Sequence, residues 1–127
     1  MESISAVQLW SGRVLSTLAV LFLCVDAIGK LLRVGPVVEG TVKLGYEENV
    51  VFPLGVLLLI GVVLYVMPRT SLLGAIYLTA FLGGAVATHV HTKDGMFFVP
   101  VIVGVVAWLG LYLRDRKLRA LVPLVDE

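Results

Sequence analysis

Four apolar segments, separated by short polar breaks, constrain the fold of this chain more than any other feature. They cover about residues 14–32, 50–67, 72–90 and 97–113, and the last of them is the shortest. A helix needs about 20 predominantly apolar residues to cross the hydrocarbon core of a bilayer. Because a backbone in lipid must satisfy its own hydrogen bonds, each segment is expected to be helical. The pattern predicts an all-α integral membrane protein, built as a four-helix bundle.

The composition of the 127-residue chain supports a membrane protein in contact with the lipid bilayer. Apolar residues make up 59% and charged residues 15% of the chain, whereas soluble proteins contain about 45–50% and about 25%. The net charge of +1 argues against a nucleic-acid partner, which would require a basic surface. Cys24 is the only cysteine, so an internal disulfide and a cysteine-rich metal site are excluded. We expect a single membrane domain over residues 1–127.

Residues 34–49 differ from the four segments because they are amphipathic rather than uniformly apolar. Pro36 suits a first helical position, and Gly45 suits the residue that follows a helix end. Between them, valines recur at a spacing of four, and so do charged residues. This pattern predicts a short amphipathic helix that lies at the membrane interface between the first and second spans.

Basic residues predict the orientation of the bundle. With four spans, both termini and the turn at residues 67–71 lie on one side of the membrane. That side carries more Lys and Arg than the other, which favours cytoplasmic termini. The terminal side has Arg13, Arg69, Arg114, Arg116, Lys117 and Arg119, and the other side has Lys30, Arg33, Lys43 and Lys93.

Two further features belong to the terminal side. The basic run at residues 114–119 directly follows the fourth span, which is typical of a juxtamembrane anchor. Aromatic residues also gather near this side, and Trp10, Tyr65, Trp108 and Tyr112 are expected at the interface.

Asp26 and Lys30 lie inside the first span, in the stretch "FLCVDAIGKLLR". A charged side chain at the centre of a spanning helix costs about 2.5–3.5 kcal/mol on insertion scales. Such residues normally face the bundle interior and mark a functional site. The alternative is an ion pair that only fixes helix packing, with Lys30 extending to the interface. The sequence leaves both interpretations open.

The directions of the helices bring the polar residues to one end of the bundle. The first and third spans run the same way, so their C-terminal ends lie on the same side of the membrane. The amphipathic segment 34–49 covers that same end. We therefore expect a polar pocket there. Its candidate ligand-binding residues are Asp26, Lys30, Glu39, Tyr46, Thr88, His89 and His91.

The two histidines form the sequence "HVH" at the end of the third span. In a helix they point in widely different directions, and His91 is expected near the face of Gly84 and Thr88. No Glu or Cys stands at ligand spacing, so we expect no metal site. No nucleophile, phosphate-loop or dinucleotide motif is present. Catalytic residues are therefore unassigned, and we do not expect the chain to be an enzyme on its own.

Several short motifs, taken in order, resemble a known family. They are "W..RVL", "D.IGKLLR", "LGY", "GVLLLIGVVLYVMPRT", "LLGAIYLTAFLGGAVATHV" and "AWLGLYLRDRKLRALVP". This series is similar to the DoxX-like family of small bacterial membrane proteins. The resemblance covers nearly the whole chain and implies a compact four-helix bundle in the inner (plasma) membrane.

The resemblance also carries expectations about function. Some relatives are linked to quinone-coupled sulfur oxidation, as subunits of a thiosulfate:quinone oxidoreductase, and others to membrane redox-stress complexes. In the family pattern, Lys30, Glu39, Gly45 and His89 match recurring positions. Many members have serine at the position of Asp26.

Three functions remain as hypotheses. The first is a membrane redox subunit that binds a quinone or another lipophilic ligand in the polar pocket, dependent on a cofactor or a partner subunit. Lys30 or His89 would donate a hydrogen bond to a carbonyl oxygen, and Asp26 or Glu39 would set the charge. The second is a small proton-linked transporter, which would need a homo-oligomer because one copy has no second repeat. The third is a non-catalytic membrane scaffold or assembly factor. No resident cofactor is evident from the sequence.

Overall fold

The computed structural model describes residues 4–125, and all regular secondary structure in that range is helical. Three helical stretches are long and apolar enough to cross a membrane, namely Ala6–Leu31 (α1), Glu48–Val66 (the 3₁₀ helix η1 followed by α3) and Ser71–Thr92 (α4). The fourth expected span, α5, has 17 residues. At 1.5 Å per residue it is about 26 Å long, slightly less than the hydrocarbon core of about 30 Å. The predicted all-α membrane bundle is confirmed. Its elements are α1 (Ala6–Leu31), α2 (Gly35–Lys43), the 3₁₀ helix η1 (Glu48–Val50), α3 (Val51–Val66), α4 (Ser71–Thr92), α5 (Phe98–Arg114) and α6 (Arg116–Leu121).

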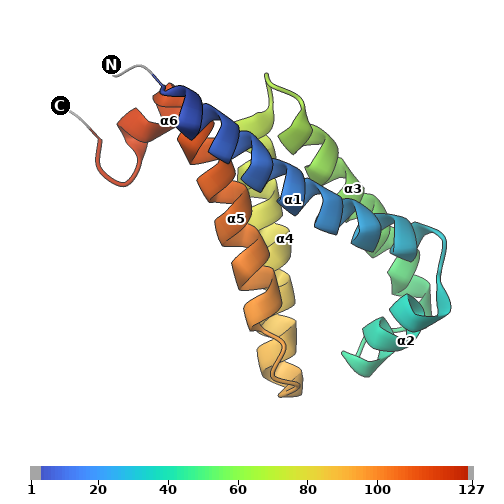
Figure 1. Cartoon of the computed structure of the whole chain (residues 1–127). Coiled ribbons are helices and arrows are strands. Elements are labelled where there is room, and N and C mark those ends of the chain that lie inside the picture. Colours follow the sequence, from blue (N-terminus) through green and yellow to red (C-terminus); the bar gives the residue numbers. More distant parts are fainter. Residues whose placement is uncertain (1–3, 126–127) are drawn as a thin grey trace.

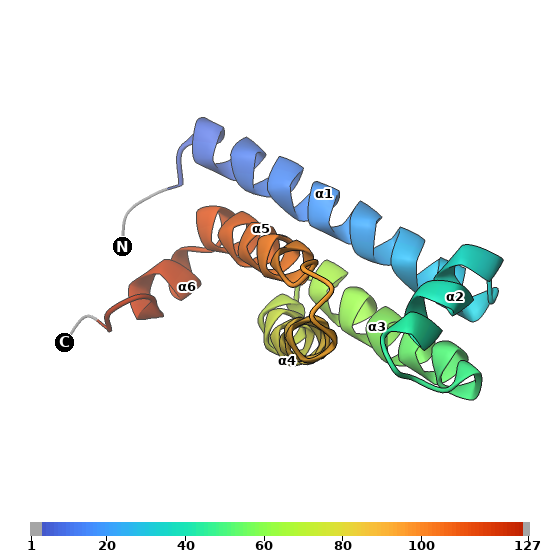
Figure 2. The same cartoon turned by 90° about the horizontal axis from the view of Figure 1, so that it is seen from below.

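The four long helices form a ring in which each packs against two others. α1 packs against α3 and α5, and α4 packs against the same two helices, so α1 and α4 lie across the bundle from each other. Both views show the C-terminal ends of α1 and α4 diverging, with α2 beside the end of α1 and the start of α3 (Figures 1 and 2). The bundle is therefore closed near the termini and splayed at the opposite end.

Helix α1 begins eight residues before the expected boundary, because a polar cap starts it ahead of the apolar segment. Ser5 and Gln8 form a capping box, in which the Gln8 N–H donates to Ser5 Oγ at 3.1 Å and the Ser5 N–H donates to Gln8 Oε1 at 3.2 Å. The basic run after α5 also folds into a helix, α6, which the sequence did not predict. The Asp115 carboxylate caps it by accepting from the Lys117 and Leu118 N–H groups.

The predicted short helix between the first two spans is present as α2, and its ends follow the sequence signals. Pro36 lies in its first turn, and Gly45 follows its end with a φ of 97°, a conformation that favours glycine. The helix is shorter than the expected segment 34–49, since residues 44–47 form a turn that leads into η1. Its position at the membrane interface stays a prediction.

The closed end of the bundle depends on small residues and one buried tyrosine. A Cβ atom added to Gly110 would lie 2.7 Å from the Ser16 nitrogen, so α1 and α5 cross in close contact there. The Ser16 hydroxyl lies 2.8 Å from the Tyr65 hydroxyl, which donates to the Ala107 carbonyl at 2.6 Å. Tyr65 is 1% exposed. The predicted interfacial position of Tyr65 is therefore wrong, because its hydroxyl finds its partners inside the bundle.

Candidate functional site

A cavity of about 780 Å³ lies at the splayed end of the bundle. Its wall includes residues of α1, α2, α3 and α4, the turn after α2, and the first turn of α5. Small-molecule sites in proteins typically measure about 300–1,000 Å³. The cavity is thus large enough for an organic ligand, and it lies where the sequence predicted a polar pocket.

The wall of the cavity changes from apolar to polar along the helices. On α1, Phe22 precedes Asp26 and Lys30, and on α4, Phe81 precedes Thr88. Because both helices run toward the splayed end, the aromatic side chains lie nearer the middle of the bundle than the polar ones. This arrangement suits a molecule with an apolar tail and a polar head.

Asp26 and Lys30 form an ion pair on the cavity wall. Lys30 Nζ lies 2.5 Å from Asp26 Oδ1, and the side chains of Lys30 and Asp26 are 13% and 36% exposed. The base of the Lys30 side chain packs against α3, where a Cβ atom on Gly55 would lie 2.9 Å from Lys30 Cβ. An ammonium group has three N–H donors, and the carboxylate uses one of them. Lys30 therefore retains donors for a ligand in the cavity.

Tyr46 connects the turn after α2 to α4 across the cavity. Its hydroxyl lies 2.9 Å from Thr88 Oγ1, and Thr88 Oγ1 in turn lies 2.9 Å from the Gly84 carbonyl, to which it donates. Since Thr88 has a single hydroxyl proton, Tyr46 is the donor in the first of these bonds. The segment 35–46 is thereby joined to the helix that carries His89.

His89 pairs with Asp94, a residue that the sequence reasoning did not assign to the site. Nδ1 of His89 lies 2.7 Å from Asp94 Oδ2, and the Met96 N–H donates to Asp94 Oδ1 at 2.9 Å. The Met96 N–H lowers the pKa of Asp94 below its usual 3.8, and His89 acts in the same direction. An ionised carboxylate only accepts hydrogen bonds, so neutral His89 carries its proton on Nδ1. Its Nε2 is then left as an acceptor.

The structure brings five of the seven candidate residues to the cavity wall and leaves two outside. Glu39 is exposed, because α2 turns Val37 and Thr41 toward the cavity instead. His91 is also exposed, since the cavity follows the flank of α4 that carries His89 and Thr92. His91 and Glu39 therefore lie outside the cavity wall, and their role in ligand binding stays untested. The residues on the wall are Asp26, Lys30, Tyr46, Thr88 and His89, and their role in ligand binding stays a prediction.

Both histidines of the "HVH" sequence lie within α4. As expected for a helix, their side chains therefore point in widely different directions. Across residues 4–125, no three His, Cys, Asp or Glu side chains gather in a group that could hold a metal ion.

Comparison with known protein families gives a match over most of the chain. A family model described as the DoxX-like family matches residues 14–110, which confirms the resemblance inferred from the motifs. No curated protein and no solved structure gives a significant match.

Proposed function

The chain belongs to the DoxX-like family of membrane proteins, and we propose that it binds a quinone or quinol, or a lipophilic molecule with a similar head, in the cavity at the splayed end. The observation that supports this proposal is the change of the cavity wall from apolar to polar toward that end. A quinone has an apolar tail and a ring with two oxygen atoms, so its tail would lie near Phe22 and Phe81. Its ring would lie among Lys30, Tyr46 and His89.

The hydrogen-bonding groups in the wall favour the reduced form of such a ligand. Lys30 offers donors, and Asp26 holds the ammonium group in place from the same helix. His89 offers an acceptor at Nε2 while Asp94 holds its Nδ1 proton. A quinol oxygen accepts from Lys30, and the hydroxyl at the other side of the ring donates to His89. A quinone has no hydroxyl to donate, so it leaves the His89 acceptor unpaired.

In this proposal the chain is the quinone-binding subunit of a membrane redox system. A partner subunit carries the redox centre, and the chain holds the ring and accepts a hydroxyl proton at His89. The bundle lies in the inner membrane with its termini in the cytoplasm, the orientation that the basic residues favour.

The proposal is tested by titrating the purified chain in detergent with a short-tail ubiquinol. Lys30→Met and His89→Ala each remove a group from the cavity wall. Since a hydrogen bond to a charged group is worth about 1.5–3 kcal/mol, Lys30→Met should weaken binding about tenfold or more.

Glu39→Gln and His91→Ala are matched controls, because both residues were candidates from the sequence and both lie outside the cavity. They should leave the affinity unchanged. Unchanged binding in Lys30→Met and His89→Ala, or equal losses in the two controls, would contradict the assignment.

A further inference from the structure

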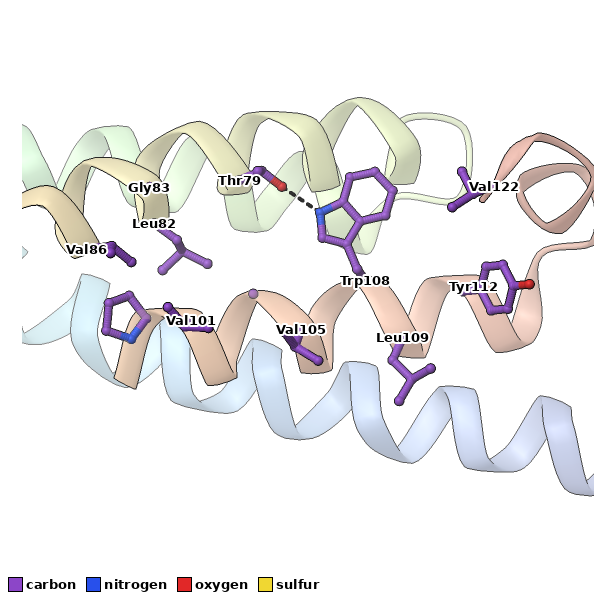
Figure 3. Close-up of a pocket in the computed structure, with 12 residues that line it drawn as sticks. Thr79, Leu82, Gly83, Val86, Val101, Val105, Trp108, Leu109, Tyr112 and Val122 are labelled. Atoms are coloured by element: carbon purple, nitrogen blue, oxygen red, sulfur yellow. Dashed lines mark hydrogen bonds between the residues drawn. The ribbon is translucent and has the colours of Figure 1, made fainter. Parts of the chain in front are cut away.

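A second hollow lies outside the quinone cavity, as an apolar groove of about 540 Å³ between α4 and α5. Figure 3 shows its wall, with Leu82 and Gly83 on α4 facing Val101 and Val105 on α5. Trp108 Nε1 donates to the Thr79 hydroxyl at 2.5 Å, so these two polar groups satisfy each other. Within residues 4–125, Tyr112 at one end is the only ionisable side chain that lines the groove.

The end of the groove at Tyr112 is formed partly by α6. Val122, which caps α6, lines the groove together with Tyr112 (Figure 3). α6 is fixed to the bundle by Leu118, which is 3% exposed and belongs to the hydrophobic core. The basic residues of α6 are therefore held beside one end of an apolar groove.

Within residues 4–125, the segment that contains α6 carries more positive than negative charge. Residues 114–119 contain four basic side chains and one acid, Asp115. The Asp115 carboxylate accepts from the backbone N–H groups of Lys117 and Leu118, at 2.9 and 3.3 Å, as the cap of α6. The cations of α6 thus have no ion-pair partner within residues 4–125.

Arg119 is the cation of α6 that contacts α5 next to Tyr112, although it is not itself among the residues that line the groove. Its Nη2 donates to the Leu113 carbonyl at 3.4 Å, directly after Tyr112 in the chain. Its Nε is buried, and no hydrogen-bond partner for it exists within residues 4–125.

We infer that the α4–α5 groove and α6 together bind one anionic phospholipid. An acyl chain lies in the groove, and the phosphate accepts hydrogen bonds from Arg119 while Arg116 and Lys117 add attraction for the negative headgroup. The proposal does not rest on the quinone cavity, because the two hollows share only Leu82 and Pro100.

The first test uses the unaltered chain. Native mass spectrometry from detergent compares phosphatidylglycerol with phosphatidylcholine of the same acyl chains, and the net charge of the former should give a tighter single bound lipid. Glycerophosphoglycerol, which has the headgroup without chains, should bind far more weakly than the whole lipid. Equal affinities for the two lipids, or equal binding of the chainless headgroup, would overturn the proposal.

The second test removes one cation. Because each basic residue near the headgroup contributes about a fivefold gain in affinity, Arg119→Gln should weaken phosphatidylglycerol binding by about that factor. Arg119→Lys should restore part of the loss. Arg69→Gln is the matched control, since Arg69 lies in the turn between α3 and α4 on the same side of the membrane. If Arg119→Gln and Arg69→Gln weaken phosphatidylglycerol binding equally, the lipid responds only to the overall surface charge, and the proposed site is rejected.

The third test fills the groove. A Cβ atom on Gly83 would meet no atom within 4 Å, so Gly83→Leu places a side chain in the groove without a clash. It should lower the lipid affinity about tenfold, because overpacking a site costs about 1–3 kcal/mol and about 1.4 kcal/mol corresponds to a tenfold change in affinity. Gly84→Leu, equally free of clashes but located in the quinone cavity, should leave lipid binding unchanged. If Gly83→Leu instead separates a dimer and leaves lipid binding intact, the groove is an interface between copies and the proposal is wrong.

Discussion

Nδ1 of His89 lies 2.7 Å from Oδ2 of Asp94, and the second oxygen of Asp94 is held by the backbone N–H of Met96. The carboxylate is thus fixed in position on one side of the imidazole ring. This geometry makes neutral His89 an acceptor at Nε2, rather than the donor expected from the sequence. In the proposed function, an acceptor at this position would favour a ligand that carries a hydroxyl group.

Asp94→Asn should remove the preference for quinol over quinone. An amide can donate as well as accept, so it no longer fixes the proton of His89 on Nδ1. Quinol affinity should fall about fivefold, the scale of one hydrogen bond, and quinone affinity should stay the same. Titrations with both forms of a short-tail ubiquinone measure the ratio. An equal loss of affinity for quinol and for quinone would show that Asp94 supports only the shape of the cavity and does not fix the proton of His89.

The contribution of Asp94 to stability should depend on pH in one direction. Its pKa is lowered in the folded protein by the Met96 N–H and by His89. A lowered pKa gives a contribution that is complete above the unfolded value of about 3.8 and is lost as the pH falls through the folded value. The difference in melting temperature between the unaltered chain and Asp94→Asn should therefore shrink as the pH falls below about 4. A difference that grows toward low pH would contradict this sign.

Asp26→Asn and Lys30→Met separate the two interpretations of the charged pair. Lys30 is only 13% exposed, and Asp26→Asn leaves its ammonium group without an ion-pair partner, so this variant should lower the melting temperature. Lys30→Met should reduce ligand affinity more than it reduces the melting temperature if Lys30 donates to the ligand as proposed. If Lys30→Met lowers only the melting temperature, the pair serves helix packing alone.

Gly110→Ala should destabilise the closed end of the bundle. The added Cβ would lie 2.7 Å from the Ser16 nitrogen, which is a backbone atom and cannot rotate away. Overpacking of this kind costs about 1–3 kcal/mol. Gly104→Ala, on the same helix, meets its nearest atom at 3.7 Å and should be tolerated. Thermal unfolding in one detergent compares the two variants, and equal melting temperatures would show that α1 and α5 are not in close contact.

The sequence predicted the large features because they depend on the length and hydropathy of each apolar segment and on the direction in which successive spans cross the membrane. The apolar segments became helices, and the shared direction of the first and third spans brought Lys30 and His89 to one cavity. Pro36 and Gly45 also marked the ends of α2 correctly.

The parts that the sequence did not predict depend on geometry at single residues. Asp94 reaches His89 because Lys93 takes a left-handed conformation, with a φ of 57°, which no residue type at that position indicates. The burial of Tyr65 depends on a hydrogen-bond donor from α1 and an acceptor from α5, and these become neighbours only in the folded bundle. Which of His89 and His91 faces the cavity depended on the rotation of α4, and periodicity alone does not fix that rotation.

The central claim is that the cavity at the splayed end, and not the outer groove, holds the quinol. Gly83 and Gly84 are adjacent on α4, a Cβ on either meets open space, and only Gly84 lines the cavity. The most direct measurement is the affinity of a short-tail ubiquinol for Gly84→Leu and Gly83→Leu. We predict a loss of about tenfold in Gly84→Leu and none in Gly83→Leu. Binding to Gly84→Leu that is as tight as to the unaltered chain would contradict the claim.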